Sequence, residues 1–267
     1  MLYGPILGDM IGAPYEFLDT LHPKNKDVEL FDRVHWIRFT DDSIMTLAVA
    51  KALIYTHDKS ENEIKTKLIA CMQDFGRRYP SSYGTSFNWW INNDNPRPYN
   101  SWGNGSAMRV SAVGWLYDSL EKTNEVAKWT AEITHNHPEG IKGAQAVASA
   151  IYLARTNHSK DYIKSYIENT FNYDLSKTCD EIRPTYRFNE SCQDTVPQAI
   201  IAFLEGNDFE ECLRLAFSLG GDCDTLMCIT CSIAEAMYKV PEYLKQECIK
   251  RLNEEFLEII DVFNLLD

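Results

Sequence analysis

Basic side chains are scarce in this sequence. Its 267 residues include 26 lysines and arginines against 39 aspartates and glutamates, which gives a formal net charge of −13. A protein that binds nucleic acid or an anionic membrane by general electrostatic attraction needs a basic face. We therefore expect no nucleic-acid partner, and we expect bound cations to neutralise part of the acidic excess.

Long apolar runs are also missing. The chain has no stretch of about 18 consecutive apolar residues, the length that crosses a bilayer. Residues 1–5 contain neither a charged segment nor a long apolar run, so no signal peptide is expected. We expect a monomeric, cytoplasmic protein with no membrane partner.

The cysteines lack the spacing of a structural zinc site. There are eight, most in apolar contexts typical of helices, where a free thiol packs as a small hydrophobic group. Cys228 and Cys231 form a Cys-x-x-Cys pair without a second such pair, so we interpret them as reduced core residues. His135 and His137 form His-x-His, but no third ligand is near, so we interpret them as loop residues before a helix that starts at Pro138.

Helical periodicity dominates what the sequence does contain. Apolar residues recur at steps of three and four, and no alternating strand pattern, repeat or linker divides the chain. We therefore predict one all-α domain, residues 1–267, folded as a compact orthogonal helical bundle. The predicted helices cover residues 41–55, 61–78, 121–134, 139–155, 160–171, 195–204, 209–219, 226–238 and 241–262.

The N-terminal segment has small residues at a helical spacing. Gly4, Gly8 and Gly12 would share one face of a helix, which allows a neighbouring backbone to approach closely. Pro14 disfavours further helix, so Glu16 is expected on the loop that follows. Residues 19–38 are polar and mixed, and we expect an irregular, exposed segment there.

Residues 80–106 are predicted to form a long loop, because prolines and small polar residues alternate there with aromatic ones. A long irregular loop inside a compact domain is more often functional than accidental. A surface loop anchored by buried aromatic side chains is an equally weighted alternative. The loop ends at Gly103–Ser106 before a helical stretch, and a glycine-rich helix start exposes backbone N–H groups to an anion.

Two clusters of threonine and aspartate stand out. They are Thr40–Ser43 and Gly220–Thr225, and each precedes a predicted helix, whose partly positive N-terminus favours carboxylates. For either cluster alone, simple helix capping is the plain alternative. Two clusters of carboxylate and hydroxyl oxygens without nearby histidine or cysteine ligands indicate a site for Mg²⁺, Mn²⁺ or Ca²⁺ rather than zinc.

Four segments, in this order, resemble the signatures of the ADP-ribosylglycohydrolases: Gly8–Glu16, Thr40–Ser43, Gly103–Arg109 and Gly220–Thr225. The family includes ADP-ribosyl-arginine and ADP-ribosyl-serine hydrolases. The resemblance implies an all-α fold with a central cleft that holds two Mg²⁺ ions, or Mn²⁺, beneath a loop carrying Glu16. The implied metal ligands are Thr40, Asp41, Asp42, Asp222, Asp224 and Thr225.

The activity implied by the resemblance is hydrolysis of the glycosidic bond between ADP-ribose and an arginine side chain, a serine side chain or a small acceptor. Glu16 is the candidate for proton handling, a role that Asp41 or Asp42 could share. The implied substrate-binding residues are Gly103, Asn104, Gly105 and Ser106. Among them, the N–H groups of Gly105 and Ser106 would meet the pyrophosphate, and Asn104 would bond a ribose hydroxyl. The sequence does not choose which loop aromatic stacks on adenine.

The sequence departs from the family pattern at a few points. Ser43 stands where threonine is commonest, and both residues carry a hydroxyl. The chain is short for the family, so we expect the loops that select the leaving group to be trimmed. Asp94 is a candidate for an acidic residue that some members carry before the Gly-Asn-Gly motif.

Two other functions are compatible with parts of this pattern. A catalytically silent ADP-ribose-binding protein of the same fold could dispense with several of the carboxylates that this chain retains. A prenyl-diphosphate synthase is also helical and binds Mg²⁺, but it needs an Asp-Asp-x-x-Asp spacing. Here Asp41 and Asp42 are followed by residues 43–47, which contain no aspartate.

Overall fold

Helices account for the regular secondary structure of the protein. The computed structural model describes residues 1–18, 21–31 and 38–266. Within these ranges there is no strand, and an isolated β-bridge joins Gly103 to Ser191. The all-α prediction is confirmed. The segment expected over residues 19–38 lies partly outside the described residues.

The described residues form a succession of helices of unequal length. In chain order they are α1 Tyr3–Gly12, η1 Ala13–Tyr15, α2 Asp41–Thr56, α3 Glu61–Arg78, α4 Thr85–Asn92, α5 Gly105–Met108, α6 Ser111–Leu116, α7 Leu120–Glu132, α8 Pro138–Arg155, α9 Lys160–Phe171, α10 Cys179–Ile182, α11 Cys192–Glu205, α12 Phe209–Leu219, α13 Cys223–Met237, α14 Glu242–Ile249 and α15 Glu254–Phe263.

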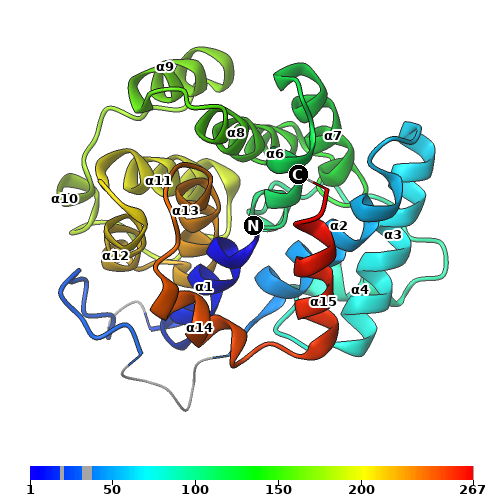
Figure 1. Cartoon of the computed structure of the whole chain (residues 1–267), viewed down its shortest axis with the longest axis horizontal. Helices are drawn as coiled ribbons and strands as arrows, with labels where there is room; N and C mark the ends of the chain where they lie inside the picture. The colour runs from blue at the N-terminus through cyan, green and yellow to red at the C-terminus, as the bar shows by residue number, and fades with distance from the viewer. Residues whose placement is uncertain (19–20, 32–37, 267) are drawn as a thin grey trace.

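Helix α13 lies at the centre of the bundle (Figure 1). Helices α1, α8, α11 and α12 pack against it, so its residues from Cys223 to Ala234 are buried on every side. A helix that is apolar all round is typical of a core position. The N-terminus of α13 therefore presents its acidic residues inside the molecule rather than at the surface.

Helix α1 packs closely against α13. A Cβ atom added at Gly8 would lie 2.4 Å from the carbonyl oxygen of Met227, and one added at Gly12 would lie 2.5 Å from the Cα atom of Asp224. Real side chains do not tolerate such distances, so only glycine fits at these positions. The predicted small-residue face is confirmed, and it brings Asp9 of α1 beside the acidic start of α13.

Two predicted stretches are wrong. The predicted loop 80–106 contains α4, whose residues Phe87, Trp90 and Ile91 are buried at helical spacing, so aromatic packing stabilises a helix there. The predicted helix 241–262 is two helices, α14 and α15. The break occurs because the Asn253 side chain accepts a hydrogen bond from the N–H of Phe256 at 2.9 Å and starts a new helix.

The plain interpretations of the cysteine and histidine motifs agree with the structure. All eight cysteines are free and buried, including the Cys-x-x-Cys pair within α13. His137 is the N-cap of α8, where its Nδ1 accepts a hydrogen bond from the N–H of Glu139 at 3.1 Å, and Pro138 is the first residue of the helix. Both motifs contribute to packing and capping.

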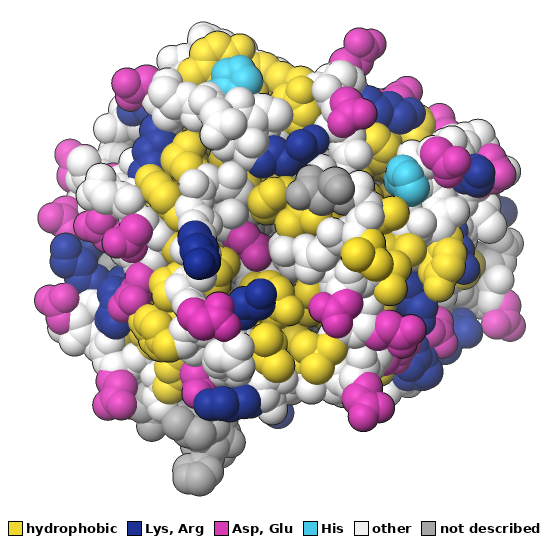
Figure 2. Space-filling view, viewed as in Figure 1, with side chains coloured by type: hydrophobic (Ala, Val, Ile, Leu, Met, Phe, Trp, Pro, Cys, Tyr) yellow, Lys and Arg dark blue, Asp and Glu magenta, His cyan; other side chains and the backbone are white. Residues whose placement is uncertain are grey.

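The acidic excess is spread out on the visible surface. In the face shown in Figure 2, acidic and basic side chains are interspersed, with apolar groups between them. No helix within the described ranges is long and apolar enough to cross a membrane. The concentrated negative charge lies inside the fold, at the starts of α2 and α13.

Candidate active site

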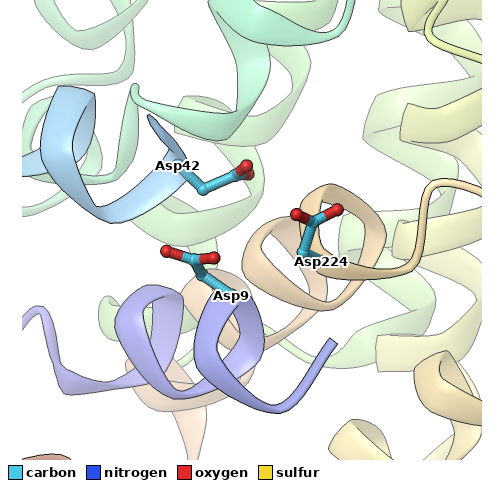
Figure 3. A group of neighbouring side chains, drawn as sticks. All are labelled: Asp9, Asp42 and Asp224. Carbon is cyan, nitrogen blue, oxygen red and sulfur yellow. The ribbon is translucent and has the colours of Figure 1, made fainter. Parts of the chain in front are cut away.

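Three carboxylates from three helices point toward one another in the interior (Figure 3). Asp9 of α1, Asp42 of α2 and Asp224 of α13 are buried, and each offers an oxygen within 4.8 Å of the others. Glu16, Asp222 and Asp224 form a second group with the same spacing. Asp224 belongs to both groups, so the two are adjacent. Either group could hold a metal ion.

Asp9 is a site residue that sequence reasoning missed. Its carboxylate accepts hydrogen bonds from the N–H and hydroxyl of Thr40, at 2.8 and 2.7 Å, from the N–H of Ser43 at 3.0 Å, and from the Ser43 hydroxyl. Burial nevertheless raises the pKa of Asp9 to about 6. An isolated carboxylate between Gly8 and Gly12, on an otherwise apolar helix, was the available signal.

Simple capping does not account for the predicted acidic clusters. Thr40 is the N-cap of α2, and its side chain accepts from the N–H of Asp42, so Asp41 and Asp42 occupy the first turn instead. Asp222 is the N-cap of α13 but makes no side-chain capping bond. Before it, Gly220 and Gly221 have φ values of 70° and 73°, which favour glycine and turn the chain into the site.

Asp42 has an unsatisfied oxygen. Its Oδ2 accepts a hydrogen bond from the hydroxyl of Thr225 at 3.2 Å and lies 3.4 Å from the hydroxyl oxygen of Thr40, whose hydrogen is donated to Asp9. Its Oδ1 is buried and has no hydrogen-bond partner among the described residues. Burial, together with neighbouring carboxylates, raises the pKa of Asp42 well above its ordinary value. A buried acceptor without a donor is rare and costly, and a cation would satisfy it.

The other carboxylates of the site also have raised pKa values and no ion-pair partner among the described residues. Burial raises the pKa of Glu16 to about 8, with further contributions from Asp222 and Asp41. Burial also raises the pKa of Asp222 to about 6 and that of Asp224 well above its ordinary range. No ion pair in the described part of the chain includes these groups. The donor set is rich in oxygen and negative charge, so it fits a hard divalent cation.

Asn104 supports Asp222. Its side-chain amide donates to Asp222 Oδ2 at 2.6 Å and to the hydroxyl of Thr195 at 3.1 Å. Both amide hydrogens are thereby used inside the protein, and only the amide oxygen is left for a ribose hydroxyl. The hydroxyl of Ser106 donates to the carbonyl of Gly140 at 2.7 Å. The backbone N–H groups of Gly105 and Ser106 take part in no hydrogen bond among the described residues.

A cavity of about 690 Å³ joins the predicted motifs. Of the predicted site residues, its walls include Glu16, Asp41, Asp42, Gly103, Asn104, Gly105, Asp222 and Thr225. Thr40, Asp224 and Ser106 are buried and are not among its lining residues. Phe87, Tyr99 and Trp102 line the cavity, so the candidates for an aromatic side chain that stacks on adenine are reduced to these three. Asp94 lies in a different cavity beside α4, whereas the exposed Glu190 lines this one and was missed.

His135 also lines the cavity, a position that its place in the predicted loop did not indicate. Its Nδ1 lies 2.7 Å from the hydroxyl of Thr134, which accepts a hydrogen bond from the guanidinium of Arg109 at 2.7 Å. Burial and the charge of Arg109 lower the pKa of His135 well below its ordinary value, so the ring is neutral.

Comparison with known proteins decides the family. A model of the family described as ADP-ribosylglycohydrolase matches residues 1–266. The chain belongs to the ADP-ribosylglycohydrolase family. The resemblance of the four motifs is thereby confirmed, and a prenyl-diphosphate synthase is excluded.

Several members are similar to this chain along most of its length. Mouse and human ADP-ribosylhydrolase ARH3 are each 25% identical to it, in alignments that cover 92% of this chain and 86% and 87% of the relatives. The ADP-ribosylarginine hydrolase Tri1 of Pseudomonas putida is 22% identical, covering 96% of this chain and 76% of Tri1. A solved structure of an ADP-ribosylglycohydrolase-related protein complex shares the fold, with a TM-score of 0.74, 20% identity, and coverage of 98% and 94%.

Membership in the ADP-ribosylglycohydrolase family assigns the reaction class. The protein is a hydrolase of ADP-ribosyl conjugates, and its acidic groups could hold metal ions.

Proposed function

We propose that this ADP-ribosylglycohydrolase is a Mg²⁺-dependent enzyme that releases ADP-ribose from a protein side chain or a small acceptor. The observation that carries the proposal is the unsatisfied Oδ1 of Asp42, a member of one of the two carboxylate groups that share Asp224. Gly103–Gly105, proposed to bind phosphate, line the same cavity as the carboxylates Glu16, Asp42 and Asp222. A site for an ADP-ribosyl group requires both sets of residues.

The proposed ligands of two Mg²⁺ ions, or Mn²⁺, provide carboxylate and hydroxyl oxygens. They are Thr40, Asp41, Asp42, Asp222, Asp224 and Thr225. Asp9 is added as a residue that fixes the first turn of α2, because it accepts four hydrogen bonds from Thr40 and Ser43. Bound divalent ions would supply positive charge that acidifies water and orients ribose hydroxyls.

Other residues of the chain are proposed to transfer the proton and to bind the pyrophosphate. In the reaction the bond from ribose C1″ to the acceptor breaks, the hydroxyl of water joins C1″, and the acceptor takes a proton. Glu16 is proposed as the group that moves this proton, because it lines the cavity together with Asp41, Asp42 and Asp222, and burial raises its pKa in the metal-free protein. Asp41 or Asp42 is the alternative. The free N–H groups of Gly105 and Ser106 are proposed to bind the pyrophosphate.

A silent ADP-ribose-binding protein is the second candidate. Buried carboxylates without cations are unfavourable for folding, because each must lose its hydration without a compensating partner. A pure binding protein would gain stability by replacing several of them with neutral residues. The retention of Glu16, Asp41, Asp42, Asp222 and Asp224 therefore favours the enzyme.

The proposal is tested by incubating the protein with ADP-ribosyl-arginine, ADP-ribosyl-serine and O-acetyl-ADP-ribose. We expect release of free ADP-ribose from at least one substrate in Mg²⁺, loss of release in EDTA, and recovery when Mg²⁺ or Mn²⁺ is returned. ADP-ribose binding, measured by calorimetry, is the control for a folded protein. Binding without release from any substrate would contradict the enzyme and favour the silent protein.

A further inference from the structure

Helix α4 forms part of the wall of the large cavity. Thr85, Ser86 and Phe87, in its first turn, line this cavity. The N-cap, Gly84, provides no side-chain hydrogen bond to the start of the helix. The helix has eight residues, and an isolated helix shorter than about 12–15 residues is only marginally stable in water. Contacts with the rest of the fold must therefore hold this wall in place.

Helix α3 provides contacts of this kind, because α4 packs mainly against it (Figure 1). A Cβ atom added at Gly76 of α3 would lie 2.6 Å from Cδ1 of Ile91, so the two helices approach closely there. On the buried face of α4, the rings of Phe87 and Trp90 stack with their centroids 5.6 Å apart. Apolar burial fixes this face, but it does not satisfy the carbonyl groups at the C-terminal end of the helix.

Two side chains of α3 bind that end of α4, where the last carbonyl groups have no partner within the helix. The side-chain amide of Gln73 donates to the carbonyl oxygens of Trp90 and Asn93, at 3.0 and 2.7 Å. The Nε of Arg77 donates to the carbonyl oxygen of Ile91 at 3.0 Å. Gln73 and Arg77 are one helical turn apart, so they lie on the same face of α3. The positive charge of Arg77 also lies at the end of α4 that carries a partial negative charge.

We propose that Gln73 and Arg77 are positioning residues for the ADP-ribosyl group, because they hold α4 where its first turn completes the wall of the cavity. This inference rests on the proposed function, which places the ADP-ribosyl group in that cavity. Neither residue lines the cavity, so both act through α4. The carbonyl group of Ile91 that Arg77 binds lies about 9 Å along the helix axis from Thr85.

Loss of these hydrogen bonds should weaken ligand binding and spare the chemical step. Without them, apolar contacts alone hold the C-terminal end of α4, and α4 is displaced in a larger fraction of the molecules. A ligand that binds only molecules with a complete wall loses apparent affinity in proportion to the fraction that remains. Asp9, Asp42 and Asp224 lie on α1, α2 and α13, which make none of these hydrogen bonds. Metal binding and kcat should therefore be preserved.

The test uses Gln73→Met, which keeps the approximate length of the side chain and removes its donors. We expect KM for the ADP-ribosyl substrate, and Kd for free ADP-ribose measured by calorimetry, to rise about three- to tenfold, as the loss of ordinary hydrogen bonds predicts. The kcat value and the affinity for Mg²⁺ should stay at wild-type values. Arg77→Met should raise Kd in the same way, whereas Arg77→Lys, which keeps the charge and an N–H donor, should restore most of the affinity.

Lys65→Met is the matched control. Lys65 is also on α3, but its ammonium group binds Glu132 of α7 at 2.7 Å and makes no contact with α4 among the printed hydrogen bonds of the described residues. This variant should keep the wild-type KM and Kd, even where it lowers Tm.

The possible results separate the positioning role from the proposed function. Wild-type Kd values in both Gln73→Met and Arg77→Met, or a fall in kcat without a rise in Kd, would overturn the positioning role while the hydrolase stands. If the wild-type protein binds ADP-ribose but releases it from no substrate, the proposed hydrolase is wrong, and the Kd values still decide the role of Gln73 and Arg77. If the wild-type protein does not bind ADP-ribose, both proposals are wrong.

Discussion

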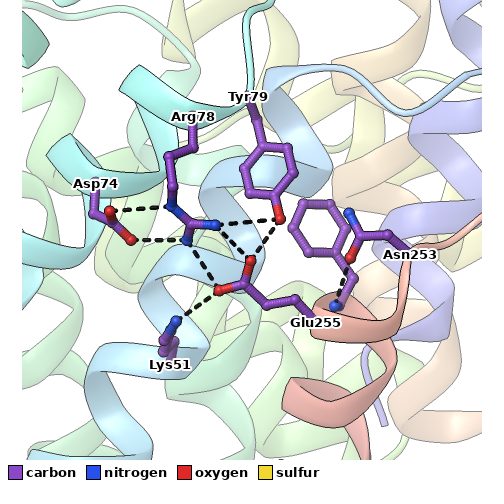
Figure 4. Close-up of polar contacts among 7 residues, drawn as sticks. Lys51, Asp74, Arg78, Tyr79, Asn253 and Glu255 are labelled. Atoms are coloured by element: carbon purple, nitrogen blue, oxygen red, sulfur yellow. Dashed lines mark hydrogen bonds and ion pairs between the residues drawn. The ribbon is translucent and has the colours of Figure 1, made fainter.

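Two groups of carboxylates in this protein have opposite surroundings. Glu255 of α15 accepts hydrogen bonds from Arg78 at 2.7 and 2.9 Å, from Lys51 at 2.8 Å and from the hydroxyl of Tyr79 (Figure 4). The Arg78 guanidinium is the main cause that lowers the pKa of Glu255 below its usual range. The carboxylates at the starts of α2 and α13 have raised pKa values and no such cations.

The difference shows which carboxylates have their negative charge compensated by basic side chains of the same chain. At Glu255 the chain supplies the positive charge, so the ionised form is stable and the contact joins α15 to α2 and α3. At Asp42 and Asp224 the chain supplies mainly hydroxyl and amide donors, and negative charge remains in excess. We infer that the second group is completed by cations from solution, at the position where the substrate is bound.

The largest effect is expected from breaking the metal group. Asp42→Asn removes one negative charge at the oxygen that lacks a partner, while keeping the size of the side chain. We expect hydrolysis to fall below detection and Mg²⁺ affinity, measured by calorimetry, to weaken sharply, with helical content by circular dichroism unchanged. Wild-type protein that binds neither Mg²⁺ nor Mn²⁺ in the same experiment would refute the metal assignment.

A smaller effect is expected from substituting Glu16, because this change should impair catalysis and leave ligand binding almost intact. Glu16→Gln keeps the shape of the side chain and removes its titration. General acid–base groups typically contribute about 10²- to 10⁴-fold, so kcat should fall by that factor. Affinity for ADP-ribose should change far less, because Gly105, Ser106 and the remaining carboxylates are intact. Near-normal turnover would instead move the proton role to Asp41 or Asp42.

Much of this site could be predicted from the sequence, because its residues come in short motifs at helix starts. The threonine and aspartate clusters lie at the starts of α2 and α13, and the structure brings them together with Glu16 and the Gly103–Gly105 turn. Their individual roles, and the organisation of the chain as one domain, stay predictions. The glycine face of α1 was also predictable, since helical spacing alone defines it.

Other features depend on contacts between distant segments. The hydrogen bonds from Thr40 and Ser43 to Asp9 connect the start of α2 to α1, and no local sequence pattern in either helix predicts them. The amide of Asn104 could reach a ligand or a neighbour, and only the fold shows that it holds Asp222. Helix α4 was missed because its polar residues resemble a loop, whereas its stability comes from burying Phe87 and Trp90.

The pH dependence of stability should differ between the two groups when metal is absent. The pKa of Glu16 is raised to about 8, and those of Asp9 and Asp222 to about 6, so the folded state favours their protonated forms. In EDTA, Tm should therefore fall as pH rises from about 4 to 8, by roughly 2–4 °C for each kcal/mol lost. Saturating Mg²⁺ should reduce this fall.

Asp224→Asn tests the same explanation at a single residue. Removing one buried charge should raise Tm in EDTA at pH 8 and abolish most of the Mg²⁺ response, because Asp224 belongs to both carboxylate groups. An equal Tm at pH 5 and pH 8 in EDTA would show that these carboxylates do not destabilise the metal-free protein.

The smallest effect is expected at Glu255, the carboxylate whose charge is compensated by Arg78 and Lys51. Its pKa is lowered, so its contribution is present above the ordinary glutamate pKa and is lost as pH falls through the acid range. Glu255→Gln should lower the free energy of unfolding at pH 7 by only about 1 kcal/mol, because the network is partly exposed and such ion pairs are weak. Hydrolysis and the Mg²⁺ response should stay at wild-type values. Urea unfolding in EDTA and in Mg²⁺ measures both quantities, and a change in the Mg²⁺ response would show that the two groups are coupled through α2.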